Sequence, residues 1–106
     1  MIKVVYYRDF NRVVIKGHAK SGEAGHDLVC AATSALAYTL ARNVAHMKKG
    51  GCLRTAQIKL ESGDAEIRCA PRRHFKATAT LIFDTICVGC EMLAQQYPQN
   101  ISYEIK

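Results

Sequence analysis

The chain has 106 residues, of which 49% are hydrophobic and 23% charged, and its formal net charge is +6. This length and composition predict a single domain over residues 1–106, with a core large enough to fold without disulfides. No run of about 18 uninterrupted apolar residues occurs, so we expect no membrane-spanning helix and no membrane partner. The charged, alternating start of the chain is unlike a signal peptide, so we expect a cytoplasmic protein whose five cysteines stay reduced.

Two runs of β-branched and aromatic residues open the chain. Residues 2–7 and 12–17 are joined by Arg-Asp-Phe-Asn, and this arrangement predicts a β-hairpin. The residues from 18 to 26 are mostly polar and include Gly22 and Gly25, so they predict a loop.

A helix is predicted from about residue 28 to residue 48. Asp27 is a suitable N-cap, and Gly50 and Gly51 are a suitable C-terminal stop. Apolar side chains recur at three- and four-residue spacing and predict one buried stripe. The stripe consists of Val29, Thr33, Leu36, Leu40, Val44 and Met47.

The second half of the chain repeats this pattern. Residues 53–60 and 65–70 alternate around the turn 61–64 and predict a second hairpin, which Pro71 ends. A second helix is predicted over residues 76–96, and a last strand over 101–105. The helix stripe is predicted to contain Ile82, Ile86, Cys90 and Leu93, widened by Leu81, Thr85, Val88 and Met92. The order ββ-α-ββ-α-β predicts an α+β fold, a mostly antiparallel sheet with two helices packed in layers.

A cysteine at the start of the first helix is the main chemical signal. With Asp27 as N-cap, Cys30 is the third helical residue, where unpartnered backbone N–H groups and the helix dipole favour a thiolate. The same N–H groups suit the oxyanion formed when a thiolate attacks a carbonyl. His18, at the end of a predicted strand, is the candidate base, since His26 is too close to Cys30 in sequence. A purely structural cysteine beside a surface histidine stays open as the alternative.

Residues 17–36, GHAKSGEAGHDLVCAATSAL, resemble the signature of the Prp family, the ribosomal-processing cysteine proteases of bacteria. The matching residues are Gly17, His18, Ala19, Gly25, Asp27, Leu28, Val29, Cys30, Ala31 and Ser34. Thr33 departs from the pattern, because a larger aliphatic residue is expected there.

The resemblance implies a cysteine protease-like domain with Cys30 as nucleophile and His18 as general base and then acid. It implies Gly17, Asp27 and Ser34 as supporting residues. It also implies a homodimer, and as substrate a ribosomal protein precursor whose short N-terminal extension is removed. Separately, we expect no cofactor. From the residues themselves, we expect the loop with Gly22 and Gly25 to gate entry of the substrate.

Two other constellations compete with this interpretation. Cys87-Val-Gly-Cys90 has the spacing of a zinc or redox pair, and Cys52, Cys69 and His74 are available as further ligands. The pair falls in the middle of the second predicted helix, within an apolar stripe, so we expect no metal and no redox role.

The basic residues suggest a different class of function. A small basic protein that binds RNA or the ribosome without catalysis is the alternative to a protease. The residues concerned are Lys48, Lys49, Arg54, Arg72, Arg73 and Lys76. The chain has only three Phe and five Tyr, and none forms an RNA-stacking motif with these basic residues, so a solvated charged face is favoured over nucleic-acid binding.

Overall fold

The computed structural model describes residues 1–18 and 26–106, with the backbone alone at residues 26 and 27. The strands are β1 (Ile2–Tyr7), β2 (Arg12–Lys16), β3 (Leu53–Glu61), β4 (Asp64–Pro71) and β5 (Ile101–Ile105). The helices are α1 (His26–Lys49) and α2 (Lys76–Gln96), and two short 3-10 turns lie at Arg8–Phe10 and Arg73–Phe75. The predicted order ββ-α-ββ-α-β is confirmed. The predicted gating loop, with Gly22 and Gly25, lies outside the described residues.

The strands form one mixed sheet in the order β3-β4-β2-β1-β5. The pairs β1–β2, β2–β4 and β3–β4 are antiparallel, which confirms the mostly antiparallel prediction. The last strand, β5, is parallel to β1, with Ile2 opposite Ile101. As a result, β1 lies inside the sheet, and β3 and β5 are its edges.

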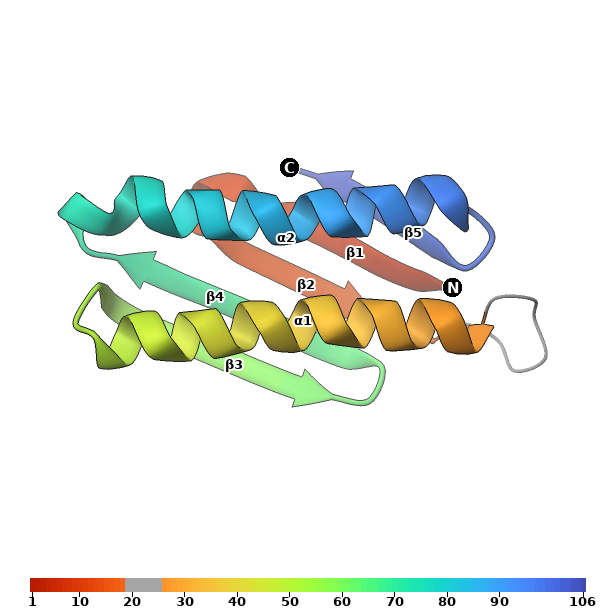
Figure 1. Cartoon of the computed structure of the whole chain (residues 1–106), viewed down its shortest axis with the longest axis horizontal. Helices are drawn as coiled ribbons and strands as arrows, with labels where there is room; N and C mark the ends of the chain where they lie inside the picture. The colour runs from red at the N-terminus through yellow and green to blue at the C-terminus, as the bar shows by residue number, and fades with distance from the viewer. Residues whose placement is uncertain (19–25) are drawn as a thin grey trace.

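Both helices lie side by side on the same face of the sheet (Figure 1). Their inner faces and the facing strands supply the core, and its largest fully buried side chains include Tyr6, Phe83, Leu40, Leu53, Ile67 and Ile101. The two helices approach closely where Gly89 of α2 meets Leu36 of α1. A Cβ added to Gly89 would lie only 2.9 Å from the Leu36 Cδ2. The result is the predicted pair of layers, helices on sheet.

The buried face of α2 differs from the predicted stripe. Ala79, Phe83, Cys87 and Cys90 are its buried residues, whereas Leu81, Val88 and Met92 are 66%, 54% and 52% exposed. Thr85 is exposed too, so the predicted widening of the stripe toward these four residues is wrong. Apolar residues surround much of this helix, so periodicity alone did not distinguish the face that packs on the sheet from the opposite one.

The start of α1 also differs from the prediction. Residues 26 and 27 have helical backbone, so Asp27 is not the N-cap and Cys30 is the fifth residue of α1. An N-cap residue has a non-helical backbone, but the dipole favours acidic residues throughout the first turn. An aspartate near a helix start is thus compatible with either place, and the sequence signal could not separate them.

Two helical segments have the length and apolar character that crossing a membrane requires. Leu28–Lys49 and Arg73–Gln96 have mean hydropathies of 1.2 and 1.5. The core helices of globular proteins meet the same criterion, and both segments here pack on the sheet. The expectation of no membrane partner stays a prediction.

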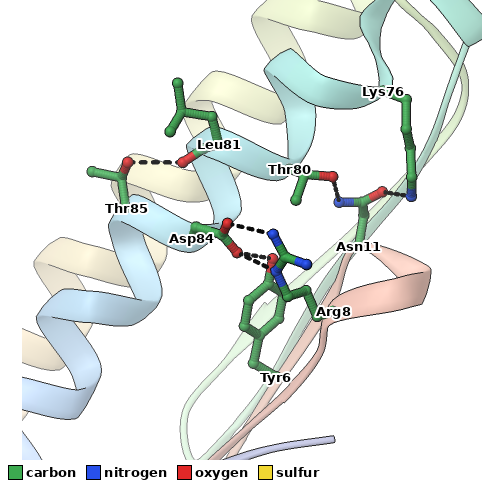
Figure 2. Close-up of polar contacts among 8 residues, drawn as sticks. All are labelled: Tyr6, Arg8, Asn11, Lys76, Thr80, Leu81, Asp84 and Thr85. Carbon is green, nitrogen blue, oxygen red and sulfur yellow. Dashed lines mark hydrogen bonds and ion pairs between the residues drawn. The ribbon is translucent and has the colours of Figure 1, made fainter.

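Hydrogen bonds between polar side chains join α2 to the hairpin of β1 and β2 (Figure 2). Asp84 accepts hydrogen bonds from the Tyr6 hydroxyl at 2.8 Å and from the Arg8 guanidinium at 3.0 Å through both carboxylate oxygens. Asn11, buried and in the left-handed region at φ 46°, donates to the Thr80 hydroxyl and accepts from the Lys76 ammonium. These bonds fix the register of α2 along the hairpin.

The Arg8 bonds predict how stability depends on pH. The hydrogen bond from Arg8 lowers the pKa of Asp84 below its usual 3.8, so the carboxylate stabilises the fold above that value and this contribution is lost as the pH falls through the lowered pKa. We expect Asp84→Asn to lower the melting temperature at pH 7, with the difference from wild type shrinking toward pH 3. Thermal unfolding followed by circular dichroism measures both, with Asp9→Asn as the control. An equal difference at the two pH values would contradict the assignment.

Candidate active site

His18 follows β2 and is held at the point where three segments meet. The N-terminal ammonium of Met1 donates to the His18 carbonyl at 2.7 Å, and the Gly17 N–H donates to the Gly63 carbonyl at 3.0 Å. Gly17 has φ 95°, and a Cβ there would lie 2.4 Å from the Met1 carbonyl oxygen. Only glycine fits this backbone conformation and this close approach. Gly17, a predicted supporting residue, therefore shapes the backbone that carries His18.

The imidazole of His18 lies against Gly63 in the turn between β3 and β4. A Cβ on Gly63 would lie 2.2 Å from His18 Nε2 and 2.6 Å from Cε1. Gly63 also has a positive φ of 72°, which the turn requires. The turn at residues 61–64 was predicted from the sequence, but its position beside His18 was not. The sequence pattern carries no signal that this glycine and His18 touch.

Cys30 approaches the same region from α1. It is half-buried and carries a thiol. Side chains on a helix lean toward its N-terminus, so a thiol on the fifth residue is directed toward the turn that begins α1. The first N–H groups of a helix have no helical partner, so this turn offers hydrogen-bond donors near the sulfur. The chemistry expected of Cys30 is compatible with the corrected helix start and stays a prediction.

Cys30 and His18 line one pocket of about 330 Å³ between α1 and the end of the sheet. Ser34, one turn beyond Cys30, lines it too and is exposed. Tyr38 on α1 and Leu60 on β3 add partly exposed apolar surface, and neither was singled out from the sequence. The pocket thus combines a thiol, an imidazole and a mixed polar and apolar lining. The side chain of Asp27, predicted to support the site, lies outside what the structure describes.

The four other cysteines differ from Cys30 in position and surroundings. Burial raises the pKa of Cys69 and Cys90 to about 11 and that of Cys87 to about 12, so these groups remain thiols at neutral pH. Cys52 is half-buried beyond the end of α1 and does not line the pocket. No group of three or more metal-ligating side chains occurs within residues 1–18 and 28–106.

Two of the six basic residues considered for RNA binding make contacts within the protein. The Arg72 guanidinium donates to the Gly51 carbonyl at 3.1 Å, and the Lys76 ammonium donates to Asn11 Oδ1 at 2.8 Å. Each contact gives the basic residue that makes it, Arg72 or Lys76, a role within the fold. They do not require a nucleic-acid partner.

A family described as cysteine protease Prp matches residues 1–102 of the chain. No curated protein matches the sequence. Among solved structures, Prp from S. aureus, an essential ribosomal processing protease in complex with a substrate peptide, is similar with a TM-score of 0.71 and 26% identity. That alignment covers 99% of this chain and 97% of the other.

Two further structures show the same similarity. The S. aureus protease with a covalently linked product peptide has a TM-score of 0.69 and 26% identity, again over 99% and 97% of the two chains. SMU.848 from Streptococcus mutans has a TM-score of 0.66 and 25% identity, over 98% of this chain and 90% of the other.

The contact between His18 and Gly63 predicts how the His18 ring responds when a methyl group is added at residue 63, as in Gly63→Ala. Alanine in a left-handed conformation costs about 1–2 kcal/mol, so Gly63→Ala and the control Gly51→Ala, at φ 80°, are both expected to lose stability. A Cβ on Gly51 meets nothing within 4 Å, whereas one on Gly63 displaces the His18 ring. NMR signals of the His18 ring should therefore shift strongly in Gly63→Ala alone. Equal shifts in the two variants would contradict the contact.

Proposed function

Because the chain belongs to the cysteine protease Prp family and is a cysteine protease, we propose that Cys30 is its nucleophile and His18 its general base and then acid. The observation that carries this proposal is that the two side chains, from different elements, line one open pocket. His18 is held there by the backbone contacts of Gly17 and by Gly63, and Cys30 by its place in α1. A nucleophile and a base converging on one cavity is the arrangement that acyl transfer requires.

The proposed reaction proceeds in two halves. His18 takes the proton of the Cys30 thiol, and the sulfur attacks the carbonyl carbon of the scissile peptide. The resulting oxyanion is stabilised by backbone N–H groups of the first turn of α1. His18 gives its proton to the leaving amine as the C–N bond breaks, which leaves an acyl-enzyme. His18 then takes a proton from water, and the hydroxide attacks the acyl carbon. The C–S bond breaks, His18 returns its proton to the Cys30 sulfur, and the new carboxylic acid departs.

We propose that the substrate is a ribosomal protein precursor whose short N-terminal extension is removed in the cytoplasm. The similarity to the ribosomal processing protease of S. aureus, solved with a substrate peptide, supports this assignment. The pocket supports it too, since Tyr38 and Leu60 offer apolar surface beside Cys30 and His18. Such a cavity suits an extended, flexible segment of chain, because a folded domain cannot enter it.

We also propose that two copies of the chain associate through α2. Leu81, Thr85, Val88 and Met92 are all exposed and follow the 4-3-4 spacing of a helix seam that packs on a second helix. Apolar residues gathered on one exposed face favour burial against a partner. A second copy presents the same stripe, so it is the occupant that self-complementary packing predicts.

The nucleophile is tested by a matched pair of cysteine variants. Cys30→Ala should lower cleavage of the extended ribosomal protein by at least about 10³-fold while retaining binding, because it removes the attacking sulfur. Cys52→Ala, which changes another half-buried cysteine outside the pocket, should leave cleavage unchanged. His18→Ala should be similarly inactive with an unchanged circular dichroism spectrum. Cleavage is followed on a gel, and full cleavage by Cys30→Ala would refute the mechanism.

The proposed dimer is tested by introducing charged residues into the exposed row of α2 formed by Leu81, Thr85, Val88 and Met92. Wild-type protein should sediment as a dimer at micromolar concentration, and the double change Leu81→Glu and Val88→Glu should give a monomer, because it places charges in the proposed seam. The control is Ile58→Glu, which places a charge on the edge strand β3 and not on α2. Ile58 is 42% exposed, and this variant should stay dimeric. A wild-type monomer at high micromolar concentration would count against the proposal.

A further inference from the structure

Thr33 has a buried hydroxyl with no hydrogen-bond partner. The residue is 5% exposed, and its Oγ1 is the one buried side-chain nitrogen or oxygen without a partner in the described part of the chain. A hydroxyl that loses water and gains nothing in return lowers the stability of the fold. Buried groups of this kind call for a specific explanation.

The Thr33 hydroxyl does not donate a hydrogen bond to a backbone carbonyl of its own helix. Two other helical threonines, Thr39 and Thr85, donate to the carbonyl four residues earlier, at 2.6 and 2.7 Å. The same bond from Thr33 would use the Val29 carbonyl, and it is not formed. Thr33 therefore lacks the bond to its own helix backbone that its two counterparts make.

Thr33 lines the same pocket as Cys30 and His18. It lies one helical turn beyond Cys30, so both residues are on neighbouring parts of one face of α1. Around it, the pocket lining is apolar and buried, with Ile2, Ala37 and Ala65 all less than 10% exposed. The pocket as a whole is mixed, because Glu61 and Asp64 also line it. Beside Ile2, Ala37 and Ala65, however, the Thr33 hydroxyl is a buried group that can both donate and accept a hydrogen bond and has no partner.

We propose that Thr33 is a specificity-determining residue, which hydrogen-bonds the polar tip of a substrate side chain that enters this part of the pocket. An apolar cavity with one placed polar group selects a ligand with a matching polar group at that point. A charged tip is disfavoured beside Thr33, because one hydroxyl among the buried residues Ile2, Ala37 and Ala65 does not offset the loss of the charge's hydration. The class selected is therefore a small uncharged polar side chain, such as threonine or asparagine, near the scissile bond. This inference rests on the proposed peptidase function.

The test compares substrates that differ in one polar group. Internally quenched peptides are made in pairs, with threonine or its isostere valine at each position around the cleavage site. At one position, wild-type protein should prefer the threonine peptide in kcat/KM by roughly 5- to 10-fold, the effect of one net hydrogen bond. Thr33→Val should remove or reverse this preference, and Thr33→Ser, which keeps the hydroxyl, should retain it.

Two further measurements separate this role from a structural one and from failure of the proposed function. Thr33→Val should also raise the melting temperature, because it removes the unpartnered hydroxyl; a rise with an unchanged peptide preference at every position would overturn the inference. The same peptides are then bound to Cys30→Ala protein, with and without Thr33→Val, and followed by fluorescence anisotropy. A threonine preference in binding that Thr33→Val abolishes supports the inference even if no peptide is cleaved, whereas equal binding of the pairs to both proteins overturns it.

Discussion

The burial of one stripe of α1 against the sheet fixes the position of the whole site. Val29, Leu40 and Val44 are at most 1% exposed, and burying each such side chain contributes about 1.5–3 kcal/mol. Cys30 follows Val29 directly, so the rotation of about 100° per helical residue places it beside this stripe and not within it. The same packing that holds α1 down therefore leaves the thiol half-buried, at the boundary between core and pocket.

The opposite side of the pocket depends on glycines. Gly17 brings the end of β2 close to Met1, which precedes β1, and Gly63 gives the His18 ring room above the β3–β4 turn. Neither glycine has a side chain that could react, yet both determine where the imidazole lies. The histidine is thus placed by the backbone, whereas the cysteine is placed by a hydrophobic helix face. Two independent parts of the fold meet at the pocket that Cys30 and His18 line.

The sequence predicted the order of elements well, because each strand and helix has a local signal of alternation, periodicity or turn residues. It predicted the bounds of α2 and the participation of His18, Cys30 and Ser34 in one region. It failed where a choice depended on tertiary contacts. The buried face of α2 is set by packing on the sheet, and the contact of Gly63 with His18 joins distant segments. Asp27 was misplaced because acidic residues suit several positions at a helix start.

The parallel pairing of β5 with β1 has a consequence for how the chain is made. β1 is synthesised first, but one of its two neighbours in the sheet, β5, consists of residues 101–105. During synthesis β1 can pair with β2 at once, while its other side has no strand to bond until residues 101–105 have left the ribosome. The pocket-lining residues all precede residue 66, so the site is complete in sequence well before the sheet that supports it can close. Pairing across so much of the chain makes closure of the sheet an entropically costly and therefore late step of folding.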